Sequence, residues 1–258
     1  MKLSITAAKT YLRIALLIAV LPIISIVVGA VATKTGLLDW KLGFGLLTFR
    51  GPPMIAMLSV ATGVIGLVVA LMAGIKDLWL RAAAPLVVTL VVMGGFMGLR
   101  SVATSVPPIH DVATDWSEPL TFSDAVMASR GAGTNPVLPD PLAPDRKSRV
   151  ADLNAKACPQ AKPAVLAEVP AAAYDKVKAA LMAAGLTVVT DDAATGRIEA
   201  VATSRLYGFK DDVVARVRAK DAGTQVDFRS VSRVGISDLG ANCKRITAIR
   251  AALLKWPL

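Results

Sequence analysis

Three apolar stretches fill most of the first 100 residues, and none occurs in the 158 residues that follow. They cover residues 14–32, 54–75 and 82–99. At about 1.5 Å of rise per residue, each is long enough as a helix to cross a hydrocarbon core of roughly 30 Å. None carries an ionisable residue in its interior, which argues against a transporter or proton pump. The sequence therefore predicts a three-span membrane anchor in residues 1–100.

The basic charge of the chain belongs mainly to this anchor. The net charge of +10 and the isoelectric point near 9.9 could suggest a nucleic-acid partner. However, residues 1–100 hold nine of the 29 basic residues and only two of the 19 acidic ones. The anchor thus accounts for +7 and the remainder for only +3. We expect the lipid bilayer as a partner, and no nucleic acid.

The distribution of lysine and arginine predicts the orientation in the membrane. Lys2, Lys9 and Arg13 precede the first stretch, and basic residues favour the cytoplasmic side. Three crossings then place residues 101–258 outside the cytoplasm, in the periplasm beside a bacterial inner membrane. Residues 30–32 (AVA) resemble a signal-peptidase site, so cleavage of the first span stays an open alternative.

A proline-rich segment follows the anchor. Residues 101–163 hold nine of the 15 prolines and show little periodicity, which predicts an extended tether or a wrapping arm. The segment contains the only histidine of the chain, His110, next to Asp111 and near Asp115. One hypothesis is acid–base chemistry or binding at His110. The other is a turn cluster in which the two aspartates cap backbone amides.

Residues 164–258 show the pattern of an α+β domain. We expect an antiparallel sheet with two helices packed against one face. Pro170 opens the first helix and Gly185 ends it, with Tyr174, Val177, Leu181 and Ala184 as its buried stripe. The expected strands cover residues 164–169, 186–190, 197–204, 213–220 and 224–231, and the last helix starts near Leu239.

The alternation of residues 213–220 and 224–231 predicts a hairpin. A two-residue loop at Ala222 and Gly223 would place Val217 opposite Phe228 on the core face. Arg218 would then lie opposite Asp227 on the other face, a favourable cross-strand pair.

Two polar segments, residues 204–212 and 232–242, are candidates for an anion site. Arg205, Lys210 and Arg233 would supply positive charge. Ser237, the first amides of the last helix and Asn242 would supply hydrogen-bond donors. The alternative is an internal network in which Asp211, Asp212 and Asp238 neutralise the same basic residues.

The two cysteines, Cys158 and Cys243, allow a disulfide in an oxidising compartment or, alternatively, a buried free thiol. Two cysteines and one histidine are too few for a closed zinc site of the usual kind. The chain shows no phosphate-binding glycine loop, no nucleophile elbow and no paired catalytic carboxylates. We therefore predict neither a metal nor a cofactor.

Three motifs carry a resemblance to a known family. They read PPIHDVATD at residues 107–115, YGFKDDVV at 207–214 and SRVGISDLGAN at 232–242, continued by Arg245 and Ile246. Over about residues 105–254 the chain resembles the bacterial domain-of-unknown-function family 1499. Several members carry similar membrane spans, so the resemblance implies a place at a membrane. The family has no established activity, so the resemblance implies no mechanism. Cys158-Pro-Gln replaces the usual aromatic residue before Pro-Asp, which makes Cys158 an unlikely family-wide structural cysteine.

The favoured function is a non-enzymatic module of the cell envelope. Its outward-facing domain would bind another membrane or envelope protein, or an anionic or lipidic ligand. The alternatives are a membrane-bound hydrolase or isomerase that uses His110 with Asp111 or Asp115, and an accessory subunit of a larger membrane complex.

Overall fold

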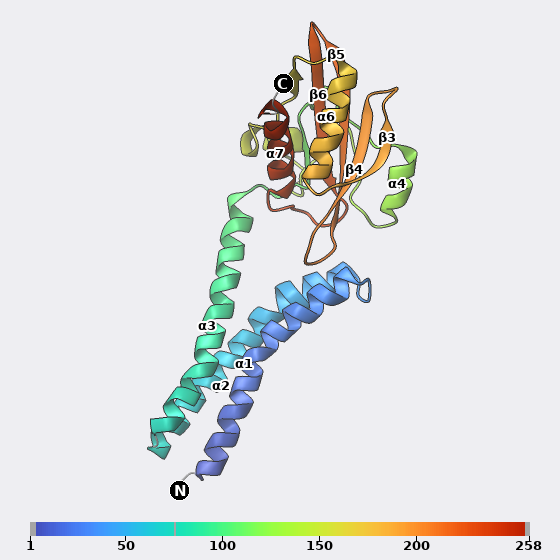
Figure 1. Cartoon of the computed structure of the whole chain (residues 1–258). Coiled ribbons are helices and arrows are strands. Elements are labelled where there is room, and N and C mark those ends of the chain that lie inside the picture. The colour runs from blue at the N-terminus through green and yellow to red at the C-terminus, as the bar shows by residue number, and fades with distance from the viewer. Residues whose placement is uncertain (1–3, 75, 256–258) are drawn as a thin grey trace. The chain divides into compact units, whose positions relative to one another are not determined.

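The computed structural model describes residues 4–74 and 76–255 (Figure 1). The chain forms two compact units. The first holds Met1–Ser101 together with Arg205–Gly208, and the second holds Val102–Ser204 and Phe209–Leu258.

The first unit is helical. Its elements are α1 (Ile5–Lys34), the π-helical η1 (Lys41–Arg50), α2 (Gly51–Ala73) and α3 (Lys76–Ser105), which continues into the second unit. Within the described residues, three segments are long and apolar enough to cross a membrane: Ile5–Lys34, Lys41–Ala73 and Leu78–Ser105. Helices suit this environment because they satisfy every backbone polar group internally. The predicted three-span anchor is confirmed. Lys2 lies outside the described residues, and so does Ile75, which was the expected end of the second apolar stretch.

The second unit is an α+β domain with an antiparallel sheet, as predicted. The strands run in the order β1-β6-β5-β4-β3, and β2 also pairs with β6. The elements are β1 (Asp111–Ala113), α4 (Asp124–Arg130), α5 (Val150–Ala157), β2 (Ala164–Leu166), α6 (Pro170–Ala183), β3 (Thr187–Asp192), β4 (Arg197–Thr203), β5 (Lys210–Lys220), β6 (Gly223–Ser232) and α7 (Ala241–Lys255).

Helices α6 and α7 lie side by side over one face of the sheet (Figure 1). The main core lies beneath them, where Val177 and Leu181 of α6 and Ile246 of α7 meet Ile198 and Phe228 of the strands. The period of 3.6 in the helices and of two in the strands accounts for these positions. Ala184, which we expected in the buried stripe of α6, is instead the exposed residue that follows the helix.

The opposite face is covered by the proline-rich segment, which wraps across it. Leu120, Phe122 and Val126 form a second apolar cluster with Val214 of β5 and Val231 of β6. Neighbouring residues of a strand point to opposite faces, so β5 and β6 are buried on both sides. The residues of β5 and β6 that point away from the main core are therefore also buried, and several of them are charged.

The predicted register of the β5–β6 hairpin is wrong by two residues. Lys220 pairs with Gly223, so the turn is Asp221-Ala222, and Asp227 lies opposite Arg216. Asp221 has a left-handed φ of 50° in this turn.

Gly223 is the first residue of β6, and a close contact with β2 requires glycine there. A Cβ at this position would lie 2.3 Å from the carbonyl oxygen of Leu166 on β2, so only glycine fits. A shift of two residues preserves the alternation, which explains why the same side chains still face the core.

Truncation of the wrapping segment will destabilise the domain. Phe122 is 6% exposed, and we expect Phe122→Ala to lower the free energy of unfolding by about 3–4 kcal/mol. Met127, 40% exposed, is the control, and Met127→Ala should cost under about 1 kcal/mol. Urea denaturation of the detergent-solubilised protein measures both values. Equal, small losses would mean that the segment does not stabilise the sheet.

Candidate functional site

Two of the sequence motifs, residues 107–115 and 232–242, meet where β6 ends and α7 begins. The backbone amide of Ser232 donates to the carbonyl of His110 at 2.8 Å, and that of Asp238 donates to Ile109 at 3.0 Å. The Asn242 side chain also donates to the His110 carbonyl, at 3.1 Å. The fold thus places His110 beside the first turn of α7.

His110 is half-buried, and no described residue hydrogen-bonds its buried Nδ1 atom. Desolvation lowers the pKa of its imidazole below the ordinary value. The charge of Asp111, the Ile236 backbone and the charge of Asp238 act in the opposite direction, whereas Arg130 adds to the lowering. The domain therefore favours the neutral imidazole.

The two aspartates proposed as partners of His110 are engaged elsewhere. The Asp111 carboxylate accepts from Arg229 Nε at 3.0 Å and Nη2 at 2.6 Å, and both side chains are almost fully buried. Asp115 accepts from the amide and hydroxyl of Ser117 and lies in a turn. These hydrogen bonds also lower the pKa of Asp115, the Ser117 hydroxyl contributing most. Among the described residues, neither carboxylate accepts a hydrogen bond from the His110 ring.

Arg233, a candidate for anion binding, is part of a buried ion-pair network. Its Nη2 atom lies 2.7 Å from Asp212 Oδ1, and Arg130 pairs with the other carboxylate oxygen. Arg233 also donates to the carbonyl of Ser129 at 2.8 Å. This arrangement is the internal neutralisation considered above as the alternative.

The other basic candidates differ in their surroundings. The backbone amide of Arg233 donates to the carbonyl of Lys210 at 2.9 Å, so these two residues are neighbours. Lys210 is exposed at the start of β5, and Arg205, also exposed, groups with the first unit. The acidic neighbour Asp211 pairs with Arg245 of α7 at 2.6 Å. Lys210 and Arg233 thus lie side by side, but the Arg233 side chain is neutralised by Asp212.

The first turn of α7 is capped by its own chain. Ser237 accepts from the amide of Leu239 at 3.2 Å. The Asp238 carboxylate accepts from the amides of Gly240 at 2.7 Å and Asn242 at 3.1 Å. Burial raises the pKa of Asp238, while these hydrogen bonds oppose that shift. The helix starts at Ala241 rather than near Leu239, because Leu239 has a left-handed φ of 53°.

A buried polar network beneath α7 was missed from the sequence. Asn242 is fully buried, accepts from Ser230 at 2.6 Å and donates to Ser232 at 3.0 Å. Arg245 also donates to Ser230, at 2.9 Å. Ser230 and Ser232 could have indicated this network, because they occupy alternate positions on the core face of β6, where apolar residues are expected.

Cys158 and Cys243 form a disulfide, with Cα atoms 5.9 Å apart. It joins the residue after α5 to α7. Among the described residues, no group of three or more His, Cys, Asp or Glu side chains could hold a metal ion.

Removal of the Asp111 charge will destabilise the domain severely. Asp111→Asn leaves Arg229 buried without a counter-ion, so the free energy of unfolding should fall by about 3–5 kcal/mol. Asp152→Asn, at an exposed position of α5, is the control and should change it by under about 1 kcal/mol. Urea denaturation measures both. A loss no greater than that of the control would contradict the structural role of the pair.

His110 should titrate below pH 6.5. It is the only histidine, so its ring signal can be followed by NMR in the full-length protein. A folded pKa below the unfolded value means that the unfolded chain binds more protons between the two values. The free energy of unfolding therefore decreases as pH falls through that window. A ring pKa at or above 6.5 would refute the prediction.

Comparison with known proteins bears on the second unit. The model of a protein family of unknown function, DUF1499, matches residues 111–253, more than half of the chain. No curated protein and no solved structure matches the chain. The matched region contains the ion pairs, the polar network and the disulfide described above. The chain is thus a member of the DUF1499 family that carries three apolar helices ahead of the family domain.

Proposed function

We propose that this protein is a multi-pass protein of a bacterial inner membrane whose α+β domain acts as a binding module in the periplasm. The observation that carries the location is the Cys158–Cys243 disulfide. Disulfides form and persist in oxidising compartments and are rare in the cytosol. The same placement follows from three crossings with the basic N-terminal end in the cytoplasm.

Binding is favoured over catalysis because the charged side chains near His110 are engaged within the domain. Asp111 neutralises Arg229, and Asp212 neutralises Arg130 and Arg233. A general base needs a substrate proton within hydrogen-bond reach and a group that orients it. The partner is another envelope protein, or an anionic or lipidic ligand, at the membrane that anchors the domain.

One observation favours the alternative, a hydrolase or isomerase that uses His110. Its Nδ1 atom is buried without a hydrogen-bond partner among the described residues, and such atoms occur at catalytic sites. Neither Asp111 nor Asp115 orients the ring, so this candidate takes second place.

The location can be tested by topology and disulfide mapping. Alkaline phosphatase fused after residue 258 should be active, and a reporter that works only in the cytoplasm should be inactive. Peptide mapping of unreduced protein should recover Cys158 linked to Cys243, and reduction should separate the peptides. An active cytoplasmic reporter, or two free thiols in freshly extracted protein, would overturn the placement.

A further inference from the structure

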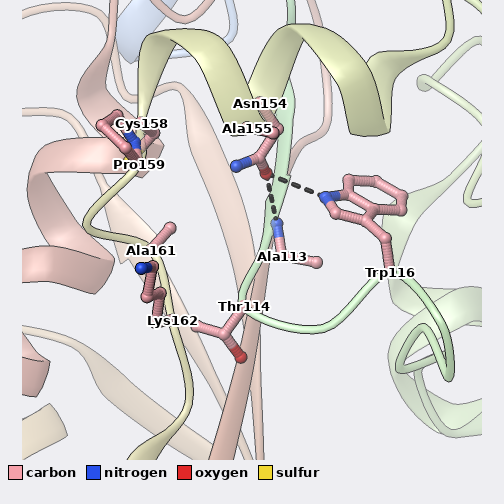
Figure 2. A pocket seen from close by; sticks show the side chains of 9 residues that line it. All are labelled: Ala113, Thr114, Trp116, Asn154, Ala155, Cys158, Pro159, Ala161 and Lys162. Carbon is pink, nitrogen blue, oxygen red and sulfur yellow. Dashed lines mark hydrogen bonds between the residues drawn. The ribbon is translucent and has the colours of Figure 1, made fainter.

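A pocket of about 350 Å³ lies between the end of β1, α5 and the segment that joins α5 to β2 (Figure 2). Its lining includes Ala113, Trp116, Asn154, Ala161 and Lys162. Its volume lies at the lower end of the range for small-molecule sites, roughly 300–1,000 Å³. His110 does not line the pocket, and neither do the residues predicted for anion binding.

Asn154 gives this pocket an amide donor of known direction. The side chain is 2% exposed, and its Oδ1 atom accepts from the Ala113 amide at 2.9 Å and from Trp116 Nε1 at 3.0 Å. Both partners can only donate, so the oxygen must lie on their side and the NH₂ group on the other. Figure 2 shows that nitrogen pointing away from Trp116 into the pocket.

The remaining lining defines the chemistry of a ligand. Lys162 is an exposed cation at the rim, and no acidic residue lines the pocket. An amide donor and an ammonium group together favour an oxygen anion. Alanines, a proline and the indole of Trp116 provide apolar walls for the rest of the ligand.

We propose that this pocket binds a small organic monocarboxylate. Its carboxylate accepts from Asn154 Nδ2 and pairs with Lys162, and its short hydrocarbon part packs against Ala113, Ala161 and Trp116. The small volume excludes a long acyl chain. A phosphate is a poorer fit, because phosphate sites use bidentate arginines or several backbone amides. This inference deepens the proposed binding function and rests on it, but it does not depend on the side of the membrane.

The test is calorimetric titration of butanoate into the full-length protein in lipid nanodiscs at pH 7, with empty nanodiscs as the blank. We expect saturable binding with one site per chain. Butanamide, which lacks the charge, and inorganic phosphate, which lacks the apolar part, should each bind about tenfold more weakly or worse. Absence of saturable butanoate binding, or equal binding of either analogue, would refute the proposal.

Two variants and one control locate the binding. Asn154→Asp keeps the oxygen that holds Ala113 and Trp116 but replaces the donor, so butanoate affinity should fall by about tenfold or more. Lys162→Gln should weaken it about threefold. Lys156→Gln removes the charge of another exposed lysine, which lies outside the lining, and should leave the affinity unchanged.

The exposed position of Lys162 keeps the test decisive even if Asn154→Asp fails to fold. If Lys162→Gln and Lys156→Gln weaken binding equally, the effect is general electrostatics and the pocket is not the site. The reporter experiment above reads only topology, so a negative titration with an outward-facing domain rejects the ligand class and leaves the proposed location standing.

Discussion

The buried ion pair between Arg229 and Asp111 connects the sheet to the segment that covers it. Arg229 lies on β6 and is 0% exposed. Besides Asp111, its guanidinium donates to the carbonyls of Leu120 and Leu138 and lies over the ring of Trp116. One side chain thus contacts four places along the wrapping segment. A buried charge must be paired and hydrogen-bonded, so the segment and the sheet can be stable only together.

Two further buried acids repeat this arrangement at the ends of α4. Glu199 of β4 accepts from the amide of Ser123 at 2.7 Å, just before the helix, and Asp212 of β5 pairs with Arg130 at its last residue. Together with the Phe122 cluster, these contacts explain how a segment with little hydrophobic periodicity still packs on a sheet. The path of the wrapping segment is determined by polar groups of the sheet, and not by an apolar stripe alone.

This organisation changes the interpretation of the charged motifs. Asp111, Asp212, Arg233 and Arg245 lie in the region that the DUF1499 model matches. In the structure each of them forms an ion pair within the domain. Such residues specify the fold of the domain. The wrapping segment also creates the pocket beside Asn154. None of the motifs contains Asn154, although Ala113 and Thr114 of the first motif line the pocket. The functional proposal therefore rests on the path of the segment and on the disulfide that attaches its end to α7.

The sequence by itself determined the three apolar helices, the α+β class, the helix that begins at Pro170 and the alternation of β5 and β6. These features depend on neighbouring residues, whose periodicity and conformational preferences are local. Only the tertiary structure decided the partners of Arg229 and Glu199, which lie 118 and 76 residues away at Asp111 and Ser123. It also decided the hairpin register, because glycine is required at position 223 by the contact with β2 and not by the turn. Pairings over such distances depend on the path of the whole chain, which no local pattern contains.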